Sequence, residues 1–218
     1  METTVLIAIG SNRRHPRFGS PADVVRAAVR ALAEARIPVE AVSRLYHTAP
    51  LGPPQPAFVN AAVRARTGLS PERLLVLLKR IERRFGPKGK IQWGPRVLDL
   101  DIIAYGSRIV PGRAEWRHGH GLAVPHRSAH KRAFVLRPLA DIAPEWRHPV
   151  LGLTVRQMAA RVGDAKSIRA TEASGVDVSG LEGASLDAPV LPVLVPPVDV
   201  VPLPRKEKSR KGPAAAAA

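Results

Sequence analysis

Two aspartates separated by one residue, Asp99 and Asp101, are the feature of this chain best suited to chemistry. They lie in an apolar, β-prone run, and alternate side chains of a strand leave the same face of a sheet. Two carboxylates about 4 Å apart repel each other by about 4 kcal/mol at an effective dielectric of about 20, so a cation is expected beside them. Mg²⁺, which takes oxygen ligands, is the first candidate. Arg96 and Trp93 add a charge and a flat ring, a combination suited to a nucleoside triphosphate.

Side chains, not a glycine-rich loop, must supply the phosphate-binding charge. The sequence contains neither the Gly-x-x-x-x-Gly-Lys-Ser/Thr pattern nor the glycine-rich loop of protein kinases. Basic residues gather around the aspartates and further along the chain: Lys88, Lys90, Arg96, His126, Arg127, Lys131 and Arg132. Phosphoryl transfer depends mainly on alignment and charge neutralisation, so a carboxylate pair surrounded by basic loops meets its requirements.

The elements that must position these residues can be predicted from hydrophobic periodicity and from turn and capping signals. Strands are expected at residues 3–9, 38–46, 58–67 and 97–105, and helices at 21–35 and 73–85. The order βαββαβ is that of a ferredoxin-like α+β fold, with an antiparallel sheet and both helices on one face. Residues 122–162 are expected to form an appended loop-and-helix unit, with its main helix at 155–161.

Composition divides the chain into a folded domain, residues 1–165, and a tail, residues 166–218. The repeated prolines of residues 189–204 exclude a regular helix or a central strand, and a basic patch and five alanines follow them. We therefore expect a Pro/Val/Ala-rich, mostly disordered tail. No apolar run is long and unbroken enough to cross a membrane, and no signal-peptide pattern opens the chain.

The charge balance indicates a polyanionic partner. The 218 residues include 34 Lys and Arg against 18 Asp and Glu, a net charge of +16. Residues 1–170 hold 29 of the basic and 12 of the acidic residues, so this part carries +17 and the remainder −1. Nucleic acid and a phosphate-rich small substrate both fit this excess, and an arginine-favouring genome explains it as well. The chain has no cysteine, which excludes disulfides and thiolate metal sites and agrees with a reducing, cytoplasmic location.

Several short motifs together resemble those of one enzyme family. They occur in this order: Ile9-Gly10-Ser11-Asn12, Thr48-Ala49-Pro50-Leu51-Gly52, Phe58-Val59-Asn60-Ala61-Ala62, the run from Trp93 to Asp101, Val124-Pro125-His126, and the run from Arg132 to Leu139. Over residues 3–160 the chain is similar to the 6-hydroxymethyl-7,8-dihydropterin pyrophosphokinases of folate biosynthesis. The Trp-Gly-Pro-Arg-x-x-Asp-x-Asp motif is the most specific of these.

The resemblance implies a transferase that moves the diphosphate of ATP to the hydroxymethyl group of a pterin and releases AMP. Two Mg²⁺ ions would be held by Asp99 and Asp101, with Arg96, Lys88 and Lys90 as further catalytic residues. The implied pterin-binding residues are Gly10, Thr48, Pro50, Leu51, Phe58, Asn60, Trp93 and Phe134. The implied ATP-binding residues are Glu82, Arg96, Ile102, His126 and Arg132. The expected partners are the pterin and ATP alone, with no membrane or nucleic acid, and the protein is expected to be a monomer.

The chain departs from the family pattern in the loop before Trp93. Lys88 and Lys90 stand where members commonly carry two arginines, which keeps the charge but loses the bidentate geometry. Gly121 stands where another arginine is common, and Phe58 replaces a common tyrosine. These departures leave open a second hypothesis, a degenerate paralogue that binds pterin or ATP without efficient transfer. A third is a ferredoxin-like nucleic-acid-binding protein, although the aromatic residues are few and are not interleaved as in an RNA-recognition motif.

Taken singly, most of these residues also have an ordinary structural interpretation. Trp93 and Phe134 could pack in the core, Asn60 could end a strand, and His126 could lie in a surface loop. His118 and His120 could bind a metal or lie in an exposed loop. Glu82 could pair with a basic neighbour on its own helix. Only the three-dimensional arrangement decides between these alternatives.

Overall fold

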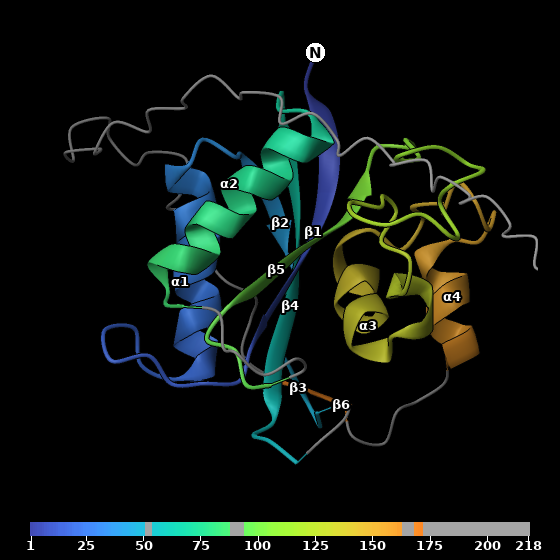
Figure 1. The fold of residues 1–218 in the computed structure, drawn as a ribbon. Coiled ribbons are helices and arrows are strands. Elements are labelled where there is room, and N and C mark those ends of the chain that lie inside the picture. The colour runs from blue at the N-terminus through green and yellow to red at the C-terminus, as the bar shows by residue number, and fades with distance from the viewer. Residues whose placement is uncertain (51–53, 88–93, 163–167, 172–218) are drawn as a thin grey trace, which may run out of the picture. The chain divides into compact units, whose positions relative to one another are not determined.

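A six-stranded antiparallel sheet forms the centre of the fold (Figure 1). The computed structural model describes residues 1–50, 54–87, 94–162 and 168–171. Its strands are β1 (Thr3–Ser11), β2 (Val39–Val42), β3 (Tyr46–Thr48), β4 (Phe58–Thr67), β5 (Asp99–Tyr105) and β6 (Ile168–Ala170). The strand order is β5-β1-β4-β3-β6, and β2 also pairs with β4. The order of the first strands is that of the predicted ferredoxin-like arrangement, which is confirmed.

Helices cover both faces of this sheet (Figure 1). The helices α1 (Pro21–Glu34) and α2 (Pro71–Arg84) pack on the face that carries Val5, Ile7 and Ile9 of β1. The helices α3 (Ala133–Ile142) and α4 (Val155–Val162) pack on the opposite face, where Leu6 lies. The two predicted helices therefore share one face as expected, and the appended unit builds a third layer that the prediction did not describe.

Capping residues fix where α1 and α2 begin. The Ser20 hydroxyl accepts a hydrogen bond from the Asp23 N–H at 3.3 Å, and the Asp23 carboxylate accepts one from the Ser20 N–H at 3.1 Å. This reciprocal pair is a capping box, and Pro21 occupies the first turn. Ser70 caps α2 in the same way, with Pro71 behind it. The predicted start of that helix at residue 73 was two residues late, because Pro71 already belongs to its first turn.

Three further differences from the prediction concern β2 with β3, β5, and α3. The strand expected at residues 38–46 is divided into β2 and β3 at Ser43, whose hydroxyl replaces a backbone acceptor by binding the Ala62 N–H at 2.9 Å. The strand expected from residue 97 begins at Asp99. The helix α3 was missed because Pro138 lies inside it, and an interior proline normally argues against a helix.

Strand β6 extends the sheet beyond residue 165, the expected end of the domain, by pairing with β3. Three residues are too few to show a strand pattern in the sequence. One compact unit spans residues 1–184, and the expected tail lies almost wholly outside the described residues. None of the helices in the described part of the chain has the length and hydrophobicity that crossing a membrane requires.

Candidate active site

A cavity of about 330 Å³ lies between the sheet and the start of α3. Its walls come from β1, β3, β4, β5 and the residues around the N-terminus of α3, which are far apart in the sequence. The sheet contributes Gly10, Asn60, Asp99 and Asp101 to one wall. The cavity therefore brings residues that precede α2 in the sequence together with residues that follow it.

Strand β5 places Asp99 and Asp101 side by side on the cavity wall. They pair with Gly10 and Ala8 of β1, two residues apart, so both project from the same face of the sheet. The Arg96 Nη1 atom donates a hydrogen bond to Asp99 Oδ1 at 2.6 Å, and both side chains are partly exposed. Arg96 is thus ion-paired with Asp99, and all three side chains line the same cavity.

The donor set fits Mg²⁺, because this ion commonly takes one or two protein carboxylates and fills its remaining positions with water and substrate phosphates. In the ranges the structure describes, no group of three or more His, Cys, Asp or Glu side chains forms a candidate metal cage. The two carboxylates face a cavity wide enough for a substrate to complete the coordination.

A polar and aromatic slot lies beside the carboxylates. The buried Asn60 amide donates a hydrogen bond to Thr48 Oγ1 at 2.7 Å, which fixes its orientation. A Cβ at Gly10 would come within 3.1 Å of Asn60 Oδ1, so a larger residue there would require the amide to shift by a few tenths of an ångström. The rings of Phe58 and Phe134 line the same space. An amide and two aromatic rings that line one space suit a flat, hydrogen-bonding heterocycle.

Two basic residues that line the cavity, His126 and Arg132, come from the segment just before α3. The His126 N–H donates to the Ile103 carbonyl at 3.0 Å, which anchors this segment to β5. Burial lowers the pKa of His126, so its ring is neutral at neutral pH and can both donate and accept. The Arg132 guanidinium lies 5.8 Å from the centre of the Phe134 ring. Arg132 thus brings a cation to the edge of the aromatic slot.

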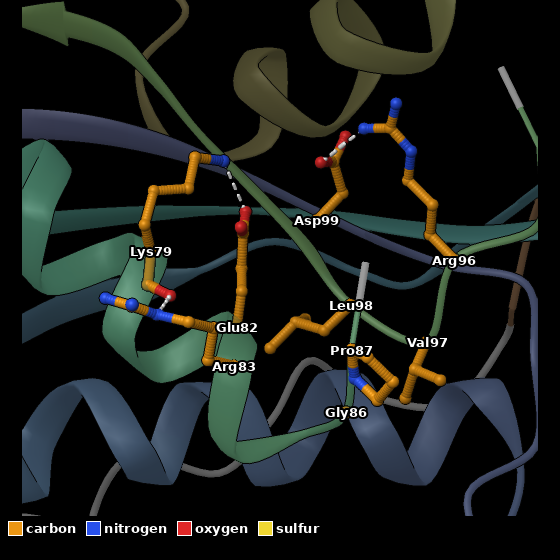
Figure 2. Close-up of a pocket in the computed structure, with 9 residues that line it drawn as sticks. All are labelled: Lys79, Glu82, Arg83, Gly86, Pro87, Arg96, Val97, Leu98 and Asp99. Carbon is orange, nitrogen blue, oxygen red and sulfur yellow. Dashed lines mark hydrogen bonds and ion pairs between the residues drawn. The ribbon is translucent and has the colours of Figure 1, made fainter. Parts of the chain in front are cut away.

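A second cavity, of about 210 Å³, lies between the end of α2 and the start of β5 (Figure 2). It shares Lys79, Arg96 and Asp99 with the first cavity. Glu82 lines this second space and accepts a hydrogen bond from Lys79 Nζ at 2.6 Å. Burial raises the pKa of Glu82. The pairing of Glu82 with a basic residue of its own helix, one of the two alternatives for this side chain, is therefore observed.

Asn12 is a site residue that sequence reasoning did not single out. Its buried side-chain amide donates to Gln55 Oε1 at 3.0 Å and to the Pro56 carbonyl at 3.2 Å, and its Oδ1 accepts from the Arg96 N–H at 2.7 Å. A backbone hydrogen bond from Asn12 to the Arg96 carbonyl adds a fourth link. One side chain thus joins the loop after β3 to the segment that carries Arg96.

Comparison with known proteins identifies the family. The model of the 7,8-dihydro-6-hydroxymethylpterin-pyrophosphokinase (HPPK) family matches residues 6–144. The chain belongs to the HPPK family. Membership makes it a diphosphokinase, which confirms the expected enzyme class and favours it over the nucleic-acid-binding alternative.

Individual HPPK relatives agree with this assignment. The 2-amino-4-hydroxy-6-hydroxymethyldihydropteridine pyrophosphokinase of Synechocystis is 39% identical over 158 residues, which cover 72% of this chain and 75% of that protein. The enzyme of the same name from Pseudomonas aeruginosa is 42% identical over 149 residues, 66% of this chain and 83% of that protein. The crystal structure of Plasmodium falciparum HPPK-DHPS has the same fold, with a TM-score of 0.57 at 15% identity, over 74% of this chain and 45% of that one.

Most of the predicted HPPK site residues that the structure describes line the first cavity. These are Gly10, Thr48, Phe58, Asn60, Phe134, Arg96, Asp99, Asp101, His126 and Arg132. Three others lie elsewhere. Glu82 lines the second cavity, the Ile102 side chain is buried in the core under α1 and α2, and Pro50 is not among the lining residues of either cavity. Leu51, Lys88, Lys90 and Trp93 lie outside the described residues.

Replacing Asn12 with alanine is expected to lower the free energy of unfolding by about 2 kcal/mol, because it removes three part-buried side-chain hydrogen bonds, to Gln55, Pro56 and Arg96. The KM for the pterin substrate should rise about tenfold or more, since the loop after β3 loses its link to Arg96. Urea unfolding and steady-state kinetics measure these effects. The exposed neighbour offers a control, Arg13→Ala, which should leave both quantities unchanged. Unaltered kinetics in the Asn12 variant would contradict the link.

Proposed function

We propose that this pyrophosphokinase transfers the β,γ-diphosphate of ATP to the hydroxymethyl group of 6-hydroxymethyl-7,8-dihydropterin and releases AMP, with the first cavity as its active site. The observation that carries the proposal is that three kinds of functional group, namely carboxylates, basic side chains and an amide with aromatic rings, line one cavity. The carboxylate pair, the basic residues His126 and Arg132, and the amide and aromatic side chains of Asn60, Phe58 and Phe134 line the same cavity. HPPK-family membership supports the reaction type.

Asp99 and Asp101 would hold two Mg²⁺ ions, because both carboxylates face the cavity. When bound, Mg²⁺ would supply charge neutralisation and alignment of the phosphate chain. Arg96, already paired with Asp99, would be positioned to bind a phosphate oxygen next to the metal-binding carboxylates.

The basic residues of the cavity would bind the phosphate chain of ATP. Arg132 offers a planar, forked set of donors at the edge of the slot, and the neutral His126 ring can donate one hydrogen bond to an oxygen. Lys79 reaches the cavity from α2. Lys88 and Lys90, which precede Trp93 in the sequence, are proposed to add further positive charge for the phosphate chain.

The polar and aromatic slot would hold the pterin. The Asn60 amide, oriented by Thr48, would bind the hydrogen-bonding edge of the heterocycle, and Phe58 and Phe134 would contact its faces. Leu51 and Trp93 are proposed to complete this pocket. Holding both substrates in one cavity places the hydroxymethyl oxygen next to the phosphate chain, which converts a bimolecular reaction into an intramolecular one.

In the proposed reaction the hydroxymethyl oxygen attacks the β-phosphorus of ATP. A bond forms between these two atoms, and the bond from the β-phosphorus to the oxygen that bridges the α and β phosphates breaks. AMP leaves with that oxygen, and the hydroxyl proton is released to solvent. The protein contributes alignment and fixed positive charge and forms no covalent bond itself. Arg96, Arg132 and His126 would stabilise the charge that develops on the transferred group.

The deciding experiment measures AMP released from ATP in the presence of 6-hydroxymethyl-7,8-dihydropterin and Mg²⁺. We expect AMP and the pterin diphosphate in equal amounts, with no AMP when the pterin is omitted. Binding of both substrates without AMP would support the degenerate paralogue instead. The same preparation, run on a size-exclusion column, tests the proposed monomer, and fractionation of the source cells tests the proposed cytoplasmic location.

A further inference from the structure

Strand β5 lies at the edge of the sheet, with β1 as its only strand neighbour in the described residues. An edge strand presents backbone N–H and C=O groups on its outer side that no strand satisfies. Asp99 and Asp101 belong to this strand, so its stiffness decides how well the two carboxylates keep their spacing. Leu100 lies between them, and its side chain is fully buried in the core beneath α2.

Two side chains at the end of α2 satisfy both outer backbone groups of Leu100. The Leu100 N–H donates to Glu82 Oε1 at 2.7 Å, and Lys79 Nζ donates to the Leu100 carbonyl at 3.3 Å. Lys79 Nζ also donates to the same Glu82 oxygen at 2.6 Å. Figure 2 shows Lys79 and Glu82 side by side on α2, pointing toward β5 where it carries Asp99. The pair thus binds β5 much as a neighbouring strand would.

The contact of Lys79 and Glu82 with Leu100 affects the two aspartates because of where it lies on β5. Leu100 is the single residue between the carboxylates, so fixing its N–H and its C=O fixes the two peptide groups that join it to Asp99 and Asp101. The side chains of the aspartates leave the opposite face and remain available to the cavity. Preorganised ligands of this kind lose less entropy on binding a metal.

The Lys79–Glu82 ion pair also limits the negative charge beside Asp99 and Asp101. Glu82 is a third carboxylate near the aspartates, and its side chain is 15% exposed. Without a cation it would add repulsion where Asp99 and Asp101 already repel each other. Lys79, three residues earlier on the same helix, neutralises it at 2.6 Å. Lys79 therefore lets a buried acceptor serve the Leu100 N–H without increasing the negative charge at the site.

We propose that Lys79 and Glu82 are positioning residues that clamp Leu100 and thereby set the geometry of the Asp99–Asp101 pair. The proposal rests on the proposed function, in which those two carboxylates hold Mg²⁺. It gives Glu82 a role different from the direct ATP contact that the family resemblance implies.

The test combines a local structural readout with metal binding. Amide hydrogen exchange of Leu100, followed by NMR, reports the clamp directly. Calorimetric titration of Mg²⁺ into protein saturated with an ATP analogue that carries a methylene group between its α and β phosphates reports the metal site without turnover. In Glu82→Ala we expect Leu100 exchange at least tenfold faster and a Mg²⁺ Kd about 10- to 100-fold higher, the range typical of groups that support metal ligands.

Matched variants separate the clamp from general damage. Glu82→Gln keeps an acceptor oxygen for the Leu100 N–H, so Leu100 should retain most of its protection. Glu72→Ala removes an exposed carboxylate from the first turn of the same helix and should change neither quantity. Lys79→Met removes both the donor to the Leu100 carbonyl and the charge that neutralises Glu82, and should raise the Mg²⁺ Kd in the same direction. If Glu82→Ala does not fold, the Mg²⁺ Kd of Lys79→Met tests the proposal in its place.

Faster Leu100 exchange in Glu82→Ala with a Mg²⁺ Kd within twofold of the wild type would overturn the proposal. So would an unchanged Leu100 exchange rate. Failure of the proposed function looks different. The wild-type protein would then release no AMP, whatever the exchange and titration experiments showed.

Discussion

Replacing Asp99 or Asp101 with alanine is expected to reduce the rate of AMP release at least a thousandfold, equivalent to about 4 kcal/mol of transition-state stabilisation. Each substitution removes one of the two carboxylates that face the cavity. The proposed transfer depends on charge neutralisation and forms no covalent intermediate with the protein, so nothing else compensates for the loss. Asp99→Ala also frees the Arg96 guanidinium from its 2.6 Å ion pair. Its defect should therefore include a higher KM for ATP.

Both variants should remain folded, because these side chains lie on a cavity wall and not in the core. Thermal unfolding and circular dichroism check this, and Mg²⁺ titration checks the cause. Glu34→Ala, which removes an exposed carboxylate from α1, is the matched control and should keep full activity. Wild-type turnover in a double variant lacking both aspartates would exclude them as the metal ligands.

The parts of the fold that the sequence predicted are those with strong local signals. The strand at Thr3, the capped helices that begin after Ser20 and Ser70, and the long strand at Phe58 are all present. The missed parts depend on distant partners. Strand β6 exists because it pairs with β3, and α3 tolerates Pro138 because its apolar face packs on the sheet. Neither cause is visible in a local window.

The same distinction holds for the site. The common face of Asp99 and Asp101 followed from the two-residue period of a strand, and that expectation matches the register of β5. Asn12 and Lys79 could not be found in this way, since their contacts reach residues 43, 84 and 21 positions away. Asn12 belongs to the Ile9-Gly10-Ser11-Asn12 motif, and its role follows from hydrogen-bond partners that no local pattern in the sequence shows.

Acidification from pH 7 to pH 5 is expected to destabilise the fold through His148 by about 2 kcal/mol. His148 is 1% exposed and follows α3. Its Nδ1 accepts hydrogen bonds from the N–H groups of Val150 and Leu151, so the ring is held neutral with its proton on Nε2. The rings of Trp116 and His130 pack edge-on against it at 5.3 and 6.1 Å.

The direction follows from the pKa values in the two states. Burial lowers the pKa of His148 in the folded protein to about 4, whereas an unfolded chain has a histidine pKa of about 6.5. Between these values the unfolded state binds more protons, so its free energy falls relative to the folded state as the pH decreases. Burial also lowers the pKa of His130, which acts in the same direction. Urea unfolding at a series of pH values measures the combined slope.

Replacing His148 with asparagine isolates its share, because the amide oxygen can accept the hydrogen bonds from Val150 and Leu151 while the side chain does not titrate. The variant should lose some stability at pH 7, where packing against Trp116 is reduced. Its stability should then fall by about 2 kcal/mol less than that of the wild type between pH 7 and pH 5. Carboxylates that titrate in the same window are common to both proteins, so their contribution cancels in the difference. Parallel pH profiles for the two proteins would show that His148 is protonated in the folded state and that the cluster around it tolerates the charge.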